Sequence, residues 1–277
     1  MARNSFPTGN TRVLGIVGDP IEQVLAPSLW SEFCSKNGFD IVCIPMHVRP
    51  ADLKTFLDGA RGWKNLEGLI VTVPHKIEAL ELVTVATARA HAIGAVNSIR
   101  PDGQGGWIGD MLDGGGFLAA YEDRIRPVRG QRVLVVGSGG VGAAIALALG
   151  EAGASEVYVS DVNASRAHAL AARLGAHGVA SKSVDPTAKG YDLVVNASPA
   201  GMRPEDPLPI DLDGATSDLA VADVVTKPAD TRLLLAATAL GCPVQGGLQM
   251  AEAQIPLQAE FFDLPPGDWR LSSSNSH

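Results

Sequence analysis

Short apolar runs, several rich in Val and Ile, alternate along the chain with longer mixed stretches that begin or end at Pro or Gly. Such runs favour strands buried in a sheet, and the stretches between them favour covering helices. The repeated β-α order predicts an α/β fold with a parallel or mixed sheet. Strands are expected at 13–17, 41–48, 68–73, 95–99, 132–136, 156–160, 191–195 and 219–224. Helices are expected from Pro74 onward and at 27–37, 51–59, 117–125, 141–151, 164–174, 229–240 and 249–262.

A glycine-rich link at 109–116 interrupts this alternation and also contains Asp110 and Asp113. The link divides the pattern into two α/β units, and a chain of 277 residues is long enough for two domains of ~100–200 residues each. The polar ends, 1–10 and the serine-rich 271–277, are expected to be loose or disordered.

The clearest local motif is the glycine turn after the expected strand at 132–136. Its G-x-G-x-x-G spacing suits a tight turn, a backbone that approaches a pyrophosphate, and a helix that packs closely on the strand. An acid at the end of the next strand, Asp161, is placed to bind a ribose. The motif predicts dinucleotide binding, and the alternative is a glycine turn of a flavodoxin-like fold without a ligand. The cofactor residues it implies are Gly137, Ser138, Gly139, Gly140, Val141, Gly142 and Asp161.

Composition narrows the class of protein. The chain is 46% hydrophobic and 19% charged, an ordinary balance for a globular protein, with a net charge of −8. This acidity argues against a general nucleic-acid or anionic-membrane surface. No apolar run reaches the ~18 residues of a membrane span, and the start does not resemble a signal peptide. The three cysteines show no C-x-x-C spacing, so we expect a cytosolic protein with reduced thiols and no metal site.

Seven short motifs then occur in one order, and together they are more specific than any of them alone. They are Gly-Asp-Pro-Ile at 18–21, Val-Thr-Val-Pro-His-Lys at 71–76, Gly-Ala-Val-Asn at 94–97, Gly-Asp-Met-Leu-Asp-Gly at 109–114, the dinucleotide turn, Asn-Ala-Ser-Pro-Ala-Gly at 196–201, and Gly-Leu-Gln-Met-Ala-Glu-Ala-Gln at 247–254. In this order the sequence resembles the shikimate/quinate dehydrogenase family, over roughly residues 13–262.

The resemblance implies a discontinuous substrate domain, 11–112 plus 248–277, and a Rossmann-type NAD(P)-binding domain, 113–247, with the active site in the cleft between them. It also implies that Lys76 and Asp113 flank the alcohol that is oxidised, and that Thr72, Asn97 and Gln254 bind the substrate's hydroxyls. Further cofactor contacts that it implies are Asn196, Ala197, Ser198, Val224 and Gly247.

The chemistry of the lysine–aspartate pair agrees with these roles. Oxidising a secondary alcohol removes a proton and passes a hydride to nicotinamide. Lys76 can donate to the developing oxygen while Asp113 fixes its rotamer. Which of the two takes the proton stays open, because such a pair titrates as a unit. Taken singly, Lys76 is compatible with a solvated lysine at a helix start, and Asp113 with a helix N-cap.

The sequence departs from the family at one end of the substrate. The family's Ser-x-Ser-Pro, whose hydroxyls hold the substrate carboxylate, is replaced by Val24, Leu25, Ala26 and Pro27. Thr226 stands where a tyrosine near that carboxylate is usual, and Ile70 replaces the usual Asn. We therefore expect weak activity on shikimate, with other donors or a more apolar substrate at this end. Gln23 is the nearest polar substitute.

The cofactor preference is also expected to differ from that of NADP-preferring members of the family. NADP-preferring members commonly carry Asn-Arg-Thr where this chain has Asp161, Val162 and Asn163. A carboxylate accepts hydrogen bonds from the ribose hydroxyls and repels a 2′-phosphate, although Arg166 lies nearby and can partly offset that. The sequence favours NAD, with NADP as the alternative.

Together these observations predict a monomeric or homodimeric NAD(P)-dependent dehydrogenase. Its substrate is expected to be a shikimate- or quinate-like cyclic hydroxy acid, bound at an altered carboxylate site. Two alternatives stay open. One is a true shikimate or quinate dehydrogenase, and the other is a catalytically silent nucleotide-binding regulatory protein.

Overall fold

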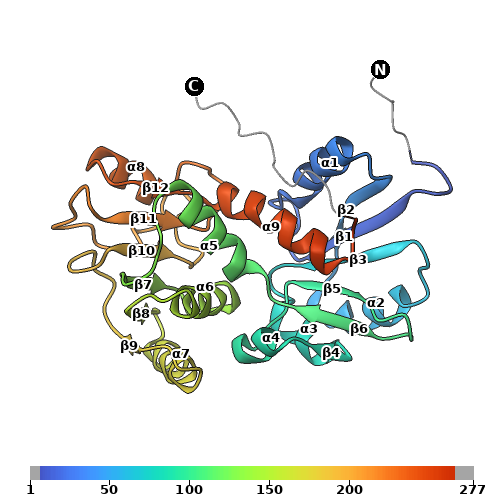
Figure 1. The fold of residues 1–277 in the computed structure, drawn as a ribbon, viewed down its shortest axis with the longest axis horizontal. Helices are drawn as coiled ribbons and strands as arrows, with labels where there is room; N and C mark the ends of the chain where they lie inside the picture. The colour runs from blue at the N-terminus through green and yellow to red at the C-terminus, as the bar shows by residue number, and fades with distance from the viewer. Residues whose placement is uncertain (1–6, 266–277) are drawn as a thin grey trace. The chain divides into compact units, whose positions relative to one another are not determined.

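The computed structural model describes residues 7–265 and divides into two compact units, each with its own sheet (Figure 1). The first unit comprises the residues up to 111 and those from 255 onward, and the second comprises 112–254. The expectations for 271–277 and for the first six residues lie outside the described residues. Because α9 (Gly247–Phe261) is one continuous helix, it begins in the second unit and ends in the first.

The first unit is built on a mixed six-stranded sheet in the order β2-β1-β3-β5-β6-β4. Strands β2, β1 and β3 are parallel, whereas β5 runs antiparallel to both β3 and β6. The strands are β1 (Arg12–Gly18), β2 (Ile41–His47), β3 (Leu66–Val71), β4 (Val85–Ala86), β5 (Ser98–Pro101) and β6 (Trp107–Asp110). The helices are α1 (Ala26–Asn37), α2 (Leu53–Ala60), α3 (Lys76–Leu82) and α4 (Ala88–Ile93), with a 3₁₀ turn at Pro50–Asp52.

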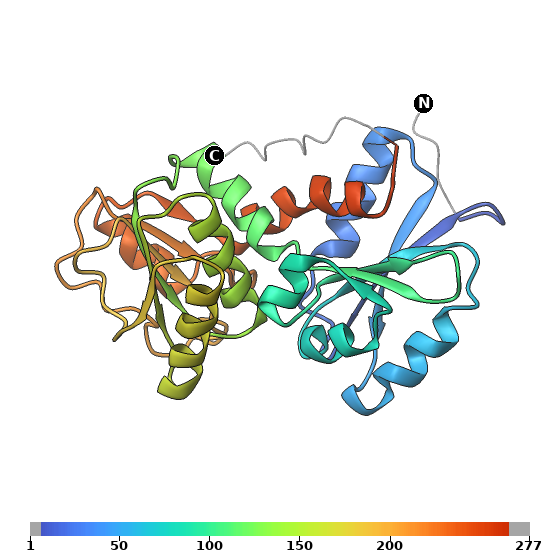
Figure 2. The ribbon, with the colours of Figure 1, turned by 60° about the horizontal axis from the view of Figure 1, so that its bottom comes forward.

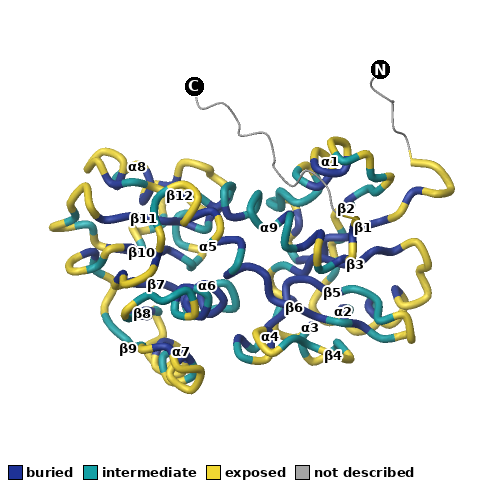
Figure 3. The backbone as a smooth tube through the Cα atoms, viewed as in Figure 1, coloured by how far each residue is buried: buried dark blue, intermediate teal, exposed yellow. Residues whose placement is uncertain are grey.

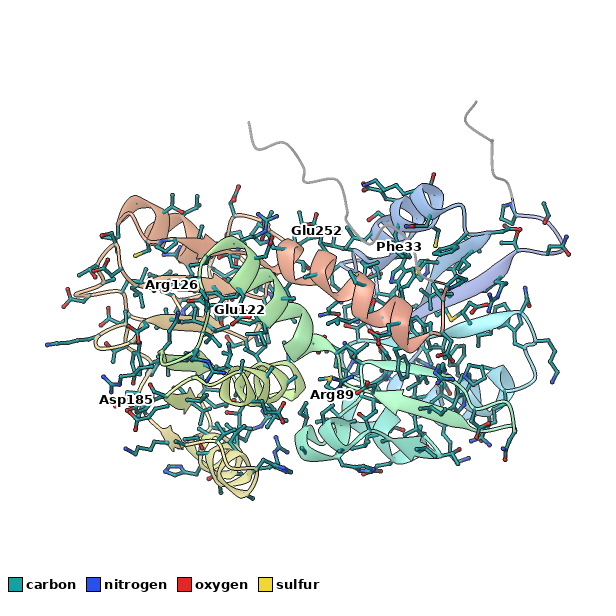
Figure 4. All side chains as sticks on the ribbon, in the orientation of Figure 1. Phe33, Arg89, Glu122, Arg126, Asp185 and Glu252 are labelled. Carbon is teal, nitrogen blue, oxygen red and sulfur yellow. The ribbon has the colours of Figure 1, made fainter. Side chains whose placement is uncertain are left out.

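One apolar cluster joins β1, β3 and α1 to the end of α9. Trp30 and Phe33 on α1 are fully buried in it, and the Trp30 ring contacts Phe262 just after α9. Figure 4 labels Phe33 on α1. The indole Nε1 of Trp30 donates to Gln258 Oε1 at 3.1 Å. This bond satisfies the one polar atom of the Trp30 ring in an otherwise apolar interior. Both ribbon views show the end of α9 beside α1 (Figure 2).

The second unit has an all-parallel sheet in the order β12-β11-β10-β7-β8-β9, with its central strands buried along their length (Figure 3). Counted within the unit, this is the strand order 3-2-1-4-5-6 of a dinucleotide-binding Rossmann fold, which excludes the flavodoxin-like alternative. The strands are β7 (Arg132–Val136), β8 (Glu156–Ser160), β9 (Ser181–Ser183), β10 (Leu193–Asn196), β11 (Ala220–Asp223) and β12 (Val244–Gln245). The helices are α5 (Asp113–Arg124), α6 (Gly140–Glu151), α7 (Ala164–Ala176), α8 (Arg232–Ala239) and the first part of α9.

The predicted α/β fold is confirmed, and several boundaries were wrong for local reasons. The strand expected at 95–99 begins only at Ser98, because Gly94 ends α4 in the left-handed conformation. The helix expected from residue 229 starts at Arg232, because the Thr231 hydroxyl accepts from the Leu234 amide and caps it. The short strands β4, β6 and β9 carry too few apolar residues to show in the pattern.

Replacing Trp30 by Ala is expected to lower the free energy of unfolding by about 3–5 kcal/mol, because it opens a large cavity and removes the partner of Gln258. Trp63→Ala is the matched control, since Trp63 is 39% exposed and should change stability by less than about 1 kcal/mol. Thermal unfolding followed by circular dichroism measures both. Equal losses in the two variants would contradict this account of the core.

Candidate functional site

Three predicted substrate residues lie at one edge of the first sheet, where β1 and β3 end. Thr72 directly follows β3, and Lys76 begins α3. The amide of Val71 donates to the carbonyl of Asn97 at 2.7 Å, and the amide of Val96 donates to the carbonyl of Lys76 at 2.9 Å. These backbone hydrogen bonds hold the segments that carry Thr72, Lys76 and Asn97 against one another.

His75, next to Lys76, has a structural role. The side chain is buried, and its Nε2 lies 2.8 Å from the carbonyl oxygen of Val48. Nε2 must therefore carry the proton, because a carbonyl oxygen only accepts. His75 occupies the N-cap position of α3 but makes no side-chain cap bond there, so its side chain serves packing.

The two acids of the glycine-rich link differ in their partners. Asp110 is buried and accepts from Arg89 Nε at 2.7 Å and from the Thr87 hydroxyl (Figure 4). Burial would raise the pKa of Asp110, but the hydrogen bonds from Arg89 and Thr87 outweigh it and lower that pKa below its usual value. The backbone carbonyl of Asp110 also accepts from the amide of Asn97 at 2.9 Å. Asp110 is thus a structural anchor next to a predicted substrate residue.

Asp113 is the first residue of α5, with Leu112 at the N-cap position, so the N-cap interpretation of Asp113 was wrong. The Asp113 side chain is buried, and its Oδ1 accepts from Gln254 Nε2 at 3.1 Å. Both residues belong to the second unit. The structure therefore pairs two residues that the sequence assigned separately to catalysis and to substrate binding.

The three residues predicted at the altered carboxylate site lie in different environments. Val24 and Ala26 are partly buried and pack against the apolar cluster around Trp30. Thr226 follows β11 in the second unit and is also partly buried. Gln23, the polar substitute, directs its side-chain Nε2 to the carbonyl of Pro20 at 2.9 Å.

The glycine turn in the second unit has the geometry that its sequence predicts. Gly137 adopts a φ of 106°, which strongly favours glycine. A Cβ on Gly142 would overlap the carbonyl oxygen of Gly137, so the start of α6 lies directly against the end of β7. No heavy atom of the described residues lies within 4 Å of where a Cβ of Gly139 would stand. The turn therefore leaves open space at the N-terminus of α6.

The turn fits a dinucleotide phosphate. The Ser138 hydroxyl is buried, and its Oγ has no hydrogen-bond partner among the described residues. Gly140, Val141 and Gly142 form the first turn of α6, where backbone N–H groups lack helical partners and attract anions. A phosphate there would satisfy both the hydroxyl and these amides. Since the turn follows β7 beside β10, it also lies at the strand-order reversal where such folds bind nucleotides.

Asp161, at the end of β8, is already engaged with the turn. Its Oδ2 accepts from the Ser138 amide at 2.8 Å, and its Oδ1 accepts from the Asn163 amide at 2.9 Å. A carboxylate has about four acceptor sites, so both oxygens retain capacity for ribose hydroxyls. The next residue, Val162, is fully exposed, and Arg166 is exposed in the first turn of α7.

A buried hydrogen-bond network, missed from the sequence, holds the 196–201 loop. Asn196 Nδ2 donates to Asp223 Oδ1 at 3.0 Å and to the carbonyl of Ala200 at 2.8 Å, and Asn196 Oδ1 accepts from the Ser198 amide and hydroxyl. Asp223 Oδ2 accepts from the Thr231 hydroxyl at 2.7 Å. The backbone of Ala197 in turn lies against Gly137. An acid directly after the apolar run of β11 was the available signal.

The remaining predicted cofactor residues also meet in the second unit. Gly247, at the start of α9, lies against the carbonyl oxygen of Val224, which follows β11.

Among residues 7–265, no helix is long and apolar enough to cross a membrane. Within the same residues, no group of three or more His, Cys, Asp or Glu side chains is placed to hold a metal ion.

Known proteins match both units. Residues 16–99 match the shikimate dehydrogenase substrate binding domain, and residues 132–207 match the family described as NADP oxidoreductase, coenzyme F420-dependent. A shikimate dehydrogenase (NADP(+)) of Rubrobacter xylanophilus is 33% identical over 267 residues, 93% of each chain. A quinate/shikimate dehydrogenase (NAD(+)) of Corynebacterium glutamicum is 37% identical over 207 residues, which are 72% of this chain and 73% of the relative.

Solved structures also match this chain, over more than nine tenths of its length. A shikimate dehydrogenase in complex with NADP⁺ matches with a TM-score of 0.88 and 27% identity, over 96% of this chain and 94% of that one. The quinate dehydrogenase of Corynebacterium glutamicum in complex with NAD matches at 0.82 and 34%, over 94% and 96%. The ligand-free 5-ketofructose reductase of Gluconobacter sp. strain CHM43 matches at 0.84 and 28%, over 94% and 95%.

Asp223 gives a prediction for the dependence of stability on pH. Burial raises the pKa of Asp223 to about 6, against the hydrogen bonds from Val225, Thr231 and Asn196, which favour the charged form. The folded state therefore binds this proton more tightly than the unfolded state. Its contribution is fully present below pH ~4 and is lost as the pH rises through about 6, a change of about 3 kcal/mol.

The check is thermal unfolding of the wild type and of Asp223→Asn between pH 4 and 8. Relative to the variant, the wild type is expected to lose stability as the pH rises to about 6 and to run parallel above about 7. Asp218→Asn, at an exposed acid of the same unit, is the control and should parallel the wild type throughout. A stability difference between Asp223→Asn and wild type that stays constant with pH would contradict the assignment.

Proposed function

The chain belongs to the shikimate and quinate dehydrogenase family, and on this basis we propose that it is an NAD(P)-dependent dehydrogenase acting on a shikimate- or quinate-like hydroxylated ring. The reaction interconverts a secondary alcohol and a ketone. Its carboxylate site differs from that of the family at Val24, Ala26 and Thr226.

One observation supports this proposal above the others: each unit holds its predicted site residues in one hydrogen-bonded group. In the first unit, backbone bonds join the segments of Thr72, Lys76 and Asn97. In the second unit, Gln254 donates to Asp113. The joint presence of the side chains Lys76, Asp113, Asn97 and Gln254 makes the silent regulatory protein the weaker alternative.

The residues divide the chemistry of the proposed reaction among them. A bound nicotinamide supplies the acceptor or donor of the hydride. Lys76 hydrogen-bonds the oxygen that changes between hydroxyl and ketone, and stabilises the negative charge that develops on it. Asp113 is the second proposed acid–base group, and its bond from Gln254 fixes the orientation of the carboxylate. Thr72 and Asn97 orient the ring through its other hydroxyls.

For the cofactor, we propose NAD in preference to NADP. Asp161 keeps free acceptor capacity on both oxygens for the ribose hydroxyls, and its charge opposes a 2′-phosphate. Val162 offers no positive charge where NADP-preferring members commonly carry an arginine.

A second candidate is a true shikimate or quinate dehydrogenase. The names of the relatives favour it, since those at 33% and 37% identity carry one or both of these activities. The named substrate of the Gluconobacter neighbour is instead a ketosugar, so similarity to this fold does not by itself select shikimate.

The cofactor proposal predicts that kcat/KM is higher with NAD than with NADP, and that Asp161→Asn shifts the ratio toward NADP because the repulsive charge is removed. Steady-state rates with both cofactors give the ratio. Asp213→Asn makes the same charge change at an exposed position of the second unit and should leave the ratio unchanged. A wild-type preference for NADP of tenfold or more would rule out the proposal.

The catalytic proposal predicts that Lys76→Ala lowers kcat by about 10²–10⁴, the usual contribution of a positioned acid–base group. NAD affinity, measured by calorimetry, should stay nearly unchanged because the cofactor turn lies in the second unit. Asp113→Asn keeps its size and much of its hydrogen bonding, so it should lower kcat more than affinity.

Lys64→Ala, at an exposed lysine of the first unit, is the matched control and should keep full activity. Reduction of the cofactor, followed by absorbance on the same preparations, measures kcat for all variants. If Lys76→Ala retained more than a third of the wild-type activity, the catalytic assignment would be wrong.

A further inference from the structure

The altered residues of the first unit belong to one apolar cluster, in which Val24 and Ala26 stay partly exposed. Ile70, at a position where the family has Asn, is buried in the cluster around Trp30. Val24 and Ala26, at the positions of the two family serines, are partly buried and pack against the same cluster. Three polar groups have thus been replaced together by aliphatic side chains that support one another.

The remaining polar side chains of this segment donate to its own backbone. Gln23 Nε2 donates to the carbonyl of Pro20 at 2.9 Å. The Ser28 hydroxyl donates to the carbonyl of Leu25 at 2.9 Å, and the Ser31 hydroxyl donates to the carbonyl of Pro27 at 2.6 Å. A serine hydroxyl has a single proton, so neither serine can bind a carboxylate without breaking its present bond. The two serines therefore do not replace the donors that the missing hydroxyls would supply, and the second N–H of Gln23 is the one side-chain donor of 23–31 that these bonds leave unused.

The segment also supplies no positive charge for an anion. Between Arg12 and Lys36 the sequence contains no Lys, Arg or His. Its acids Asp19 and Glu32 lie beside basic side chains, His47 and Lys36. A substrate carboxylate next to Val24 and Ala26 would therefore lose hydration without gaining a positive partner from this segment.

The predicted hydroxyl-binding residues next to this segment are nevertheless retained. The amide of Asp19 donates to the carbonyl of Val73 at 3.0 Å, and Gly18 lies against the Thr72 side chain. The segment that leads to Val24 and Ala26 is therefore tied to the strand end that carries Thr72. The predicted hydroxyl-binding residue Thr72 is thus connected to a segment whose side chains at 24 and 26 are aliphatic.

We propose that the substrate is an uncharged polyhydroxylated ring, a cyclic polyol or a ketose, without a carboxylate where shikimate carries one. This inference rests on the proposed function, because it assumes that Lys76 and Thr72 act on the alcohol of a hydroxylated ring. The reacting end of the substrate then carries hydroxyls, as shikimate and quinate do, and its opposite end packs on Val24 and Ala26.

Shikimate and methyl shikimate provide the direct test, because they differ only at this end, where the ester lacks the charge and adds a methyl group. With NAD, kcat/KM is expected to be at least tenfold higher for the ester than for the acid. A panel of cyclohexane polyols and ketohexoses separates the two classes of uncharged substrate, and at least one member is expected to exceed shikimate tenfold. An equal or higher kcat/KM for shikimate than for the ester and the whole panel would overturn the proposal.

The double variant Val24→Ser with Ala26→Ser tests the location. It restores two hydroxyls, so the ester-to-acid ratio of kcat/KM is expected to fall at least tenfold through a gain on shikimate. Ser31→Ala, which removes an exposed hydroxyl from α1, is the control and should keep the wild-type ratio. An unchanged ratio in the double variant, with NAD affinity intact, would overturn the assignment of these residues.

The experiment also separates this inference from the proposed function. Turnover of shikimate in preference to all uncharged compounds would leave the dehydrogenase activity in place and remove only the inference about charge. If NAD and NADP bound while no compound of either charge was turned over, the proposed dehydrogenase activity would itself be wrong, and the inference would fail with it.

Discussion

Main-chain contacts at the ends of neighbouring strands are the constraint on which the candidate site residues of each unit depend. In the first unit, bonds from Val71 to Asn97 and from Val96 to Lys76 fix the segments that follow β3 and precede β5. In the second unit, the carbonyl of Gly137 lies so close to Gly142 that no side chain fits between β7 and α6. Because these contacts are between main-chain atoms, side chains can change without moving the positions from which they project.

This constraint explains how part of a site can change while the rest is retained. Thr72 keeps its place at the end of β3, although Ile70, two residues earlier on the same strand, is apolar and buried. Val24 and Ala26 joined the same cluster, which contributes to the stability of the first unit through burial. Val24 and Ala26 thus contribute apolar contacts to the core, and serine at either position would place a polar group against that cluster.

In the second unit, a buried acid that holds the loops together also lowers the stability of the folded state at neutral pH. Asp223 is buried, which raises its pKa, yet its hydrogen bonds with Asn196 and Thr231 join the ends of β10 and β11 to the cap of α8. An apolar residue of similar size would avoid the penalty of burying a charge but would remove one of the two acceptors of Asn196 Nδ2 and the acceptor of the Thr231 hydroxyl. The loop at 196–201 lies against the glycine turn, so the network also supports the surface that we propose for the cofactor.

The sequence by itself determined the α/β class, most of the long strands and helices, and the glycine turn, because these depend on local apolar runs and on the spacing of glycines. It also named Lys76, Asp113, Asn97 and Gln254 through ordered motifs. Only the tertiary structure decided that Gln254 bonds to Asp113, that Arg89 neutralises Asp110, and that Val24, Ala26 and Ile70 share one cluster. These contacts join residues far apart in the chain, and their partners are selected by how strands and helices pack, which no local pattern records.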